Sequence, residues 1–276
     1  MREIDAYYTL SNDVKMPKIG LGTYKLKGDE AYHVVKRALA LGIRHIDSAI
    51  IYQNEKYVGQ AIKDSKIPRE EIFITSKVPP HIKNAQGTLR MFEKTLKNLD
   101  VDYLDLYIIN APGPFNDLDG DYDKENIEVY KVLEQLYNEE RVRAIGVSQF
   151  KVKDIDNIIN HCSVTPHVQQ MSYFVGHTQE DITNHCHENG IQIQAFSPLA
   201  KGYLLNNPVI ISIANKYHVK PSQLALRYIL QKDIAIIPKA SQEEHLRLNT
   251  QLDFVISEED IYELDAIKDD PRQYDD

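Results

Sequence analysis

The feature that most constrains this chain is a regular alternation of short apolar runs with segments of helical spacing. In each helical segment apolar residues recur at intervals of three and four, as on one face of a helix. Strands that alternate with helices in this way predict an α/β fold, a closed (β/α)8 TIM barrel. The eight expected strands are 19–24, 45–49, 72–78, 103–110, 143–148, 167–173, 191–197 and 235–239.

Several of these strands, such as 104–109, are nearly continuous apolar runs, which is typical of parallel strands covered by helices. Residues 7–18 are predicted to form an N-terminal β-hairpin ahead of the barrel. Residues 112–125 are predicted to form a long polar loop after the fourth strand, where barrels usually shape their substrate sites. Because no linker interrupts the pattern, we expect one domain over residues 1–276. The clearest expected helices are 31–41, 88–99, 127–138, 152–159 and 222–230.

The composition of the chain excludes several classes of partner. Its 276 residues carry a formal net charge of −9, which argues against a nucleic-acid surface, because phosphate binding needs clustered cations. No apolar run reaches membrane-spanning length, and residues 1–8 lack the apolar core of a signal peptide. We therefore expect a cytoplasmic protein whose partner is a small molecule, and a monomer rather than an oligomer.

The sequence does not predict a disulfide framework or a metal centre. Cys162 and Cys186 are two isolated cysteines, each expected to be a structural thiol. His185-Cys186-His187 places three metal-binding side chains in a row. Consecutive residues on a helix point in different directions, so these three are not expected to share an ion.

Four polar residues are predicted to meet at the C-terminal ends of neighbouring strands. Asp47 ends the second strand, Tyr52 follows it, Lys77 ends the third strand and Asn110 ends the fourth. A lysine ammonium next to a phenol favours the phenolate, so Lys77 should lower the pKa of Tyr52 from about 10. Asp47 would keep Lys77 charged, which makes Tyr52 a candidate proton donor. The alternative is that these are unrelated polar residues at strand ends.

Five motifs in order along the chain resemble the aldo-keto reductase family. Residues 47–55, Asp-Ser-Ala-Ile-Ile-Tyr-Gln-Asn-Glu, match its Asp-Thr-Ala-x-x-Tyr-x-Asn-Glu motif. Residues 20–24 match the first strand of the family. Residues 146–150, 196–199 and 237–240 match Gly-Val-Ser-Asn-Phe, Tyr-Ser-Pro-Leu and Ile-Pro-Lys-Ser in the same order. The resemblance covers nearly the whole chain. The short tail over residues 270–276 is similar to the tails of the bacterial diketogluconate and methylglyoxal reductases, which implies small polar carbonyl substrates.

The resemblance implies a barrel closed at its bottom by the hairpin, with NADP(H) extended across its top. Hydride would pass from the nicotinamide to the carbonyl carbon of a small aldehyde or ketone, and Tyr52 would protonate the carbonyl oxygen. The implied carboxamide ligands are Ser148, Gln149 and Gln170, and Phe196 would stack on the nicotinamide. The other implied cofactor contacts are Gly22, Thr23, Ser197 and Leu199, with Lys239, Ser241, His245 and Asn249 at the adenosine phosphate and adenine. The implied substrate contacts are Tyr24 and Pro79.

Two departures from the family pattern bear on function. Asn110 replaces the usual histidine; it keeps an N–H donor but cannot titrate. This change predicts a slower or differently selective enzyme. The alternatives are a nicotinamide-binding protein with little or no catalysis, or an aldolase that uses Lys77 as a Schiff base. His245 replaces a common arginine, so the preference for NADPH should be weaker and NADH should also be usable.

Overall fold

The computed structural model describes residues 2–118 and 120–268, and its core is a parallel sheet of eight strands. The strands follow one another around the sheet in chain order, from β3 to β10. Each strand is thus hydrogen-bonded to the next one along the chain. The strands are β3 (Leu21–Gly22), β4 (His45–Asp47), β5 (Phe73–Val78), β6 (Leu104–Ile109), β7 (Val142–Ser148), β8 (Val168–Ser172), β9 (Gln192–Phe196) and β10 (Ala235–Ile236).

The first and last strands meet and close the barrel. A parallel bridge pairs Ile19 with Ile236, and the Gly20 amide donates to the Ile236 carbonyl at 2.8 Å. The close approach depends on Gly22, because a Cβ atom there would lie 2.7 Å from the Ile237 carbonyl oxygen. The predicted (β/α)8 barrel is therefore confirmed.

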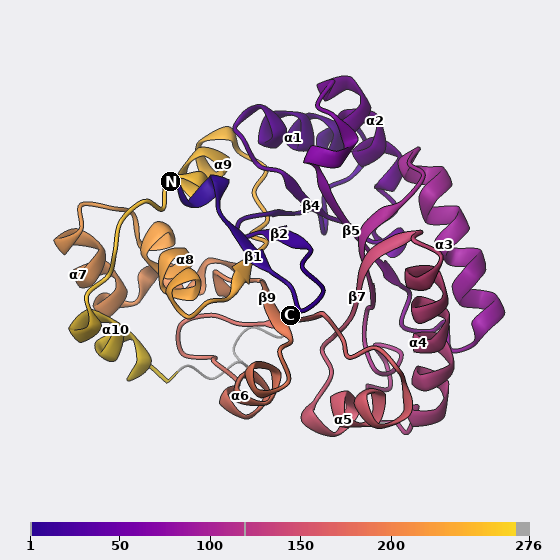
Figure 1. Ribbon diagram of the computed structural model, residues 1–276. Coiled ribbons are helices and arrows are strands. Elements are labelled where there is room, and N and C mark those ends of the chain that lie inside the picture. Colours follow the sequence, from indigo (N-terminus) through magenta and orange to yellow (C-terminus); the bar gives the residue numbers. More distant parts are fainter. Residues whose placement is uncertain (1, 119, 269–276) are drawn as a thin grey trace.

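Helices surround the barrel, as Figure 1 shows. They cover the outer face of the sheet, and α8 lies beside the strands β9 and β10. The longer helices are α1 (Gly28–Ala40), α2 (Glu55–Ser65), α3 (Ala85–Leu99), α4 (Asp123–Asn138), α5 (Val152–His161), α6 (Glu180–Glu188), α7 (Pro208–Lys216), α8 (Pro221–Gln231), α9 (Glu243–Thr250) and α10 (Glu258–Asp265). Four 3₁₀ segments are η1 (Glu3–Asp5), η2 (Ile50–Tyr52), η3 (Arg69–Glu71) and η4 (Ala200–Asn206).

The N-terminal hairpin covers one end of the barrel. Its antiparallel strands β1 (Tyr7–Thr9) and β2 (Lys15–Pro17) lie across the barrel opening at the centre of Figure 1. Leu10 and Met16 are buried there in one cluster with side chains from the barrel interior, such as Leu106. The predicted hairpin at the bottom of the barrel is therefore confirmed.

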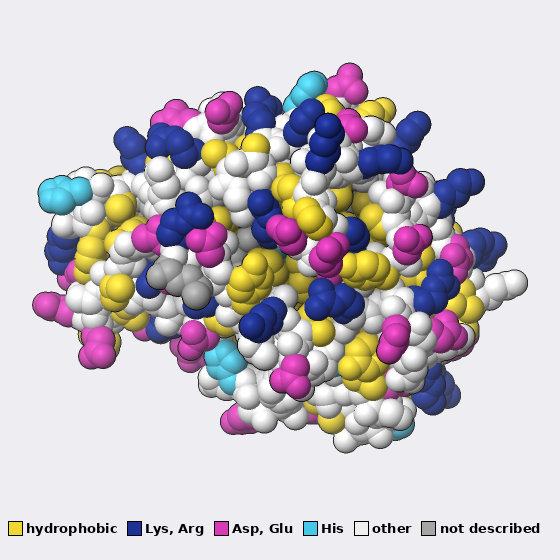
Figure 2. All heavy atoms as spheres, turned by 45° about the horizontal axis from the view of Figure 1, so that its top comes forward, with side chains coloured by type: hydrophobic (Ala, Val, Ile, Leu, Met, Phe, Trp, Pro, Cys, Tyr) yellow, Lys and Arg dark blue, Asp and Glu magenta, His cyan; other side chains and the backbone are white. Residues whose placement is uncertain are grey.

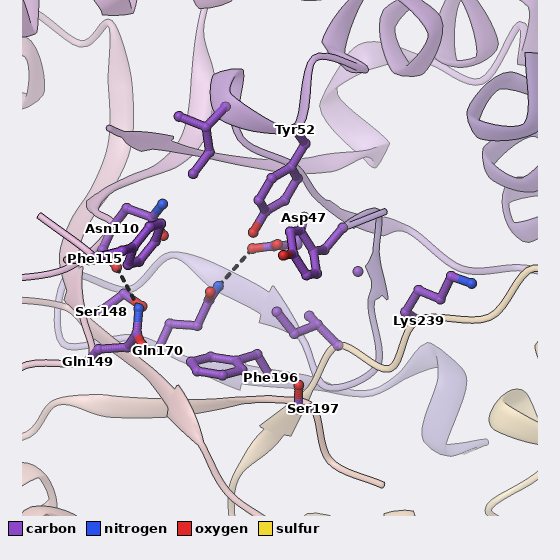
Figure 3. Close-up of a pocket in the computed structure, with 14 residues that line it drawn as sticks. Asp47, Tyr52, Asn110, Phe115, Ser148, Gln149, Gln170, Phe196, Ser197 and Lys239 are labelled. Atoms are coloured by element: carbon purple, nitrogen blue, oxygen red, sulfur yellow. Dashed lines mark hydrogen bonds between the residues drawn. The ribbon is translucent and has the colours of Figure 1, made fainter. Parts of the chain in front are cut away.

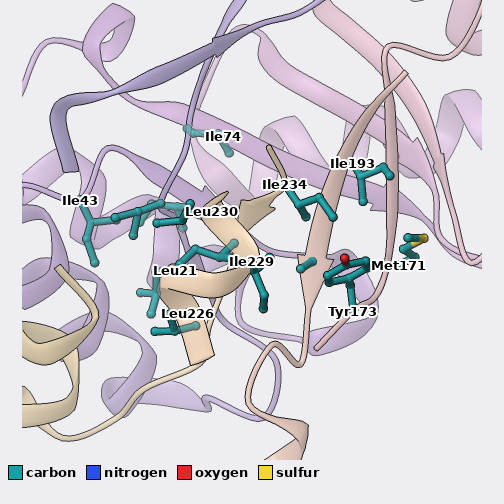
Figure 4. Packing of buried hydrophobic residues seen from close by; sticks show 14 of the residues in the cluster. Leu21, Ile43, Ile74, Met171, Tyr173, Ile193, Leu226, Ile229, Leu230 and Ile234 are labelled. Carbon is teal, nitrogen blue, oxygen red and sulfur yellow. The ribbon is translucent and has the colours of Figure 1, made fainter. Parts of the chain in front are cut away.

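The core consists of a layer inside the barrel and a larger layer between the strands and the helices. The outer layer includes Leu226 and Ile229 of α8, which Figure 4 shows near the strand residue Leu21. Side chains alternate between the two layers because successive residues of a strand point to opposite faces. In β6, for example, Ile108 faces inward and Tyr107 packs outward on Phe92 of α3.

The observed elements agree closely with those predicted. Seven of the eight strands lie inside the predicted ranges, and β7 begins one residue earlier, at Val142. Four of the five predicted helices begin one to four residues earlier than predicted, and α5 begins at Val152 as predicted. The first turn of α4 is polar and lacks apolar spacing, so this helix starts at Asp123 and the predicted loop over 112–125 ends before that residue. The acidic side chains of Asp123 and Glu125 favour this start, since they interact with the positive end of the helix dipole.

Charged side chains of both signs lie on the surface. Figure 2 shows basic and acidic side chains interspersed over the face it presents. Within residues 2–118 and 120–268, no helix combines the length and the apolar character needed to cross a membrane.

Candidate active site

The inward-facing residues at the C-terminal ends of the strands form the walls of a polar site. Asp47 is the last residue of β4, Ser148 of β7 and Phe196 of β9, while Lys77 is the penultimate residue of β5. Each lies at an even spacing from an inward-facing residue lower in its strand, such as Phe73 below Lys77. The two-residue period of the strands thus brings these side chains together at one end of the barrel.

Lys77 is the centre of this site. Its Nζ donates to Asp47 Oδ1 at 2.5 Å, to the Ser48 carbonyl at 3.1 Å and to the Tyr52 hydroxyl oxygen at 3.2 Å. Asp47 and Lys77 are both almost fully buried, with 2% and 1% of their surface exposed. An ammonium has three protons, and here each has an acceptor. The Tyr52 oxygen is therefore an acceptor for Lys77, which leaves its own proton free for another partner.

The pKa shifts of this group differ in part from the sequence prediction. Burial acts to lower the pKa of Lys77, but the charges and hydrogen bonds of Asp47 and Tyr52 raise it overall. For Tyr52, burial raises the pKa more than Lys77 lowers it. The prediction of a lowered pKa for Tyr52 is therefore wrong, because the cost of burying a phenolate exceeds the attraction of the ammonium. Tyr52 is consequently protonated at neutral pH and can act as an acid.

A chain of amides continues from Asp47 into the barrel. Gln170 Nε2 donates to Asp47 Oδ2 at 2.7 Å and to Gln194 Oε1 at 2.6 Å. Gln194 Nε2 in turn lies 3.3 Å from His45 Nε2. Burial lowers the pKa of His45 to about 3, so its imidazole is neutral at physiological pH. Both oxygens of Asp47 thus have donors, and the cation that faces Asp47 is Lys77.

A pocket lies above these residues, and Figure 3 shows its lining. Tyr52 and Asn110 project from one wall, and Phe196 and Ser197 line the opposite side. Of the residues predicted from the sequence, those that line the pocket are Gly22, Tyr24, Asp47, Tyr52, Asn110, Ser148, Gln149, Gln170, Phe196, Ser197 and Lys239. Three further lining residues were not predicted: Ile51, Phe115 and Ile237. Ile51 and Ile237 lie inside matched motifs, whereas no local pattern indicates the direction of Phe115 in its polar loop.

Lys77 lies below the pocket without lining it, and the six other predicted residues do not line it either. Thr23 is buried, and its hydroxyl donates to the Asp47 carbonyl at 2.9 Å. Pro79 is buried, and Leu199 packs against the apolar core. Ser241 lies beside Lys239, with 3.4 Å between the hydroxyl oxygen and Nζ. The two others lie on α9, where His245 is exposed and Asn249 is buried.

Two polar side chains belong to nearly buried residues of the pocket wall. They are the amide of Asn110 and the hydroxyl of Ser148. The exposed fraction of the residue surface is 5% for Asn110 and 1% for Ser148. Neither makes a side-chain hydrogen bond to any other described residue. Both residues line the pocket, so these two polar groups are available to a polar ligand there. The described residues contain no cluster of three or more His, Cys, Asp and Glu that could bind a metal.

Gln149 contacts Asn110 in a way that the sequence did not indicate. Its Nε2 donates to the Asn110 carbonyl oxygen at 3.0 Å, so part of its amide is used within the protein. The backbone of Gln149 is left-handed, with φ of 60°, as is that of Ser197, with φ of 49°. Each residue directly follows a strand, and this conformation turns the chain sharply at the edge of the pocket.

Comparison with known proteins places the chain in a family. The model of the aldo/keto reductase family matches residues 18–269. The chain belongs to the aldo/keto reductase family. It is 41% identical over 265 residues to glyoxal reductase of Bacillus subtilis (strain 168), covering 95% of this chain and 93% of the relative. It is also 35% identical to mouse aldo-keto reductase family 1 member A1, over 92% of this chain and 86% of the relative.

Solved structures agree with this assignment. An aldo-keto reductase from a Medee basin deep-sea metagenome library superposes with a TM-score of 0.90 at 38% identity, covering 95% of this chain and 94% of the other. An aldo/keto reductase from Brucella melitensis superposes with a TM-score of 0.89 at 33% identity, covering 95% and 99%. The protein is therefore an oxidoreductase of the aldehyde and ketone reductase class, and its family uses nicotinamide cofactors.

The ion pair can be tested through stability. Lys77→Met leaves the Asp47 carboxylate buried without a cation, which should cost about 3–5 kcal/mol in free energy of unfolding. The double variant Asp47→Asn, Lys77→Met should recover much of that loss. Urea unfolding measures both, and equal stability of the single and double variants would contradict the coupling.

Proposed function

We propose that this chain reduces small aldehydes or ketones with NADP(H), using Tyr52 as the proton donor. The observation that carries the proposal is the hydrogen bond from Lys77 to the Tyr52 oxygen, 3.2 Å long. Because that oxygen accepts from Lys77, the Tyr52 proton is available to a group in the pocket. As Tyr52 gives up its proton, the adjacent ammonium stabilises the phenolate that forms.

The residues around the pocket fit a nicotinamide cofactor. When bound, a reduced nicotinamide supplies the hydride for the carbonyl carbon. The unpaired Ser148 hydroxyl and the free Oε1 of Gln149 are suited to hold a carboxamide, and Phe196 offers a flat ring for stacking. Gln170 is a weaker candidate than predicted for this role, since its Nε2 donates to both Asp47 and Gln194. Gly22 and Ser197 border the same pocket.

The adenosine end of the cofactor is assigned to the region around Lys239. Lys239 leaves the pocket edge in Figure 3 and lies beside the Ser241 hydroxyl, a cation and a donor suited to a phosphate. His245 and Asn249 of α9 follow in the sequence, and we assign them to the phosphate and the adenine. Arg247 donates to Gln251 instead, at 3.2 Å. With His245 as the residue at the usual arginine position, NADH should also be accepted.

Asn110 supplies the second donor to the substrate in this proposal. Its amide is neutral at every pH, so it can orient a carbonyl oxygen but cannot exchange a proton with it. Apolar side chains of Ile51 and Phe115 border the pocket near it, with Tyr24 packed on Tyr52 at a ring distance of 5.1 Å. We therefore place a small carbonyl compound between Tyr52 and Asn110, with its remainder against the apolar side chains.

The sequence also suggested two other hypotheses, an aldolase and a nicotinamide-binding protein without catalysis. An aldolase needs a neutral lysine amine as nucleophile, whereas Asp47 and Tyr52 raise the pKa of Lys77 against the effect of burial. A nicotinamide-binding protein without catalysis would use the same pocket, and the Tyr52 experiment below distinguishes it from a reductase.

We also propose that residues 1–276 act as one domain and as a monomer.

Replacing Tyr52 tests the proton donor. Tyr52→Phe should reduce turnover of methylglyoxal or phenylglyoxal with NADPH by about 10²–10⁴-fold, because the general acid is lost. Cofactor affinity, measured by isothermal titration calorimetry, should stay within about twofold. Tight cofactor binding by the wild type with no turnover on a broad carbonyl panel would favour the binding-protein hypothesis.

Replacing Asn110 tests whether the neutral amide limits the rate. Asn110→His restores the donor usual in the family and should raise the rate on simple aldehydes, by up to about 10²-fold if the donor is misplaced in the natural protein. Steady-state kinetics at constant NADPH gives the comparison. A lower rate would show that the pocket is built around asparagine.

The cofactor preference can be tested at His245. His245→Arg adds a permanent cation and should tighten NADPH binding by about tenfold, through a charge-assisted pair with the 2′-phosphate. The affinity for NADH, which lacks that phosphate, should not change. An equal effect on both cofactors would place His245 outside the phosphate site.

A further inference from the structure

Lys83 lies behind the wall of the pocket that carries Asn110. It belongs to the connection between β5 and α3, and its side chain is half-buried. Its Nζ donates to the Ala111 carbonyl at 3.2 Å, to the Pro112 carbonyl at 2.7 Å and to Asn126 Oδ1 at 2.8 Å. These contacts join one lysine to the chain just after β6 and to α4.

Three successive carbonyl groups in this stretch accept hydrogen bonds from side chains. Gln149 holds that of Asn110, Lys83 holds those of Ala111 and Pro112, and Asn126 Nδ2 also donates to Pro112 at 2.9 Å. Asn126 is 3% exposed, so the contact with α4 is buried. The backbone after β6 is thus held from behind, while the Asn110 side chain faces the pocket without a partner in the described protein.

The geometry points to Lys83 as a positioning residue for the proposed reductase reaction. By holding the backbone at Ala111 and Pro112, it fixes the direction of the Asn110 amide and the path of the loop that brings Phe115 to the pocket. This role rests on the function proposed above, since it matters only if Asn110 and Phe115 contact substrate. It does not follow from the motifs, because Lys83 lies outside all of them.

The charged form of Lys83 matches its surroundings. Three acceptors require three protons, which an ammonium has and a neutral amine lacks. Burial lowers the pKa of Lys83 to about 8, against the opposing effect of Glu125 and Asp154. The Tyr122 ring lies 5.5 Å from Nζ, and Glu128 of α4 accepts from the nearby Ala85 amide. The three hydrogen bonds from Lys83 to Ala111, Pro112 and Asn126, here called the clamp, are therefore complete below about pH 8. Above that pH the clamp loses one hydrogen bond.

This titration should appear in the activity and not as unfolding. As pH rises through about 8, Lys83 loses its proton, the clamp weakens and turnover should fall. Stability should change in the opposite direction, because the unfolded chain keeps the ordinary pKa of 10.5 and binds more protons over this range. The effect of Tyr52 is separate, since burial raises its pKa above its ordinary value of 10.

The experiment compares Lys83→Met and Lys83→Arg with the control Lys97→Met, which changes an exposed lysine of α3. Lys83→Met should lower kcat/KM for methylglyoxal by about 10–100-fold, as expected when a substrate contact is misplaced. It should also remove the decline in activity near pH 8. Lys83→Arg keeps a charge that does not titrate, so it should restore activity and move the decline to higher pH. Hydrogen exchange of residues 111–118 should be faster in Lys83→Met alone.

The outcomes separate this inference from the proposed function. If Lys83→Met matches Lys97→Met in kinetics, pH profile and exchange, Lys83 has no positioning role. If exchange increases but the pH profile is unchanged, the role of Lys83 is structural and the inference is wrong. If the wild type reduces no carbonyl, the proposed function fails, and the exchange measurement alone decides whether Lys83 holds this segment.

Discussion

The buried ion pair between Lys77 and Asp47 is the contact on which the rest of the site depends. Removing two charges from water is costly, and it is tolerated only where every proton and every oxygen has a partner. Here Lys77 donates to three acceptors, and the second oxygen of Asp47 accepts from Gln170. The pairing of β4 with β5 brings Asp47 and Lys77 to adjacent strands, so the sheet provides this arrangement.

The two groups assigned to the substrate carbonyl are neutral, and a lysine lies behind each of them. Tyr52 presents a phenol and Asn110 an amide, and neither carries a charge at neutral pH. The cations lie behind them: Lys77 supports the Tyr52 oxygen, and Lys83 supports the backbone after Asn110. A neutral donor in a fixed position can orient a carbonyl, but it depends on its scaffold for direction. This dependence is why the contacts behind Asn110 matter more than they would behind a charged side chain.

The sequence predicted most of the fold and much of the site, for physical reasons that differ between elements. Strands such as β6 are nearly continuous apolar runs, so their positions are evident from the sequence. The polar first turn of α4 has no apolar spacing, so the sequence there predicts a loop. Asp47, Ser148 and Phe196 lie inside motifs at strand ends, where the topology determines where they meet. Phe115 and Lys83 lie in connections without a motif, and their directions depend on packing against distant segments.

By itself the sequence determined the barrel and the family, and it singled out Tyr52 as the proposed proton donor, because periodicity and local motifs carry that information. Only the tertiary structure decided the protonation state of the site. The pKa of Tyr52 is a balance between burial and the charge of Lys77, and burial outweighs the charge once the barrel closes around both. Likewise, only the folded chain brings Lys83 to the carbonyls after Asn110. Lys83 lies in the connection after β5, these carbonyls lie in the connection after β6, and α3 separates the two in the sequence.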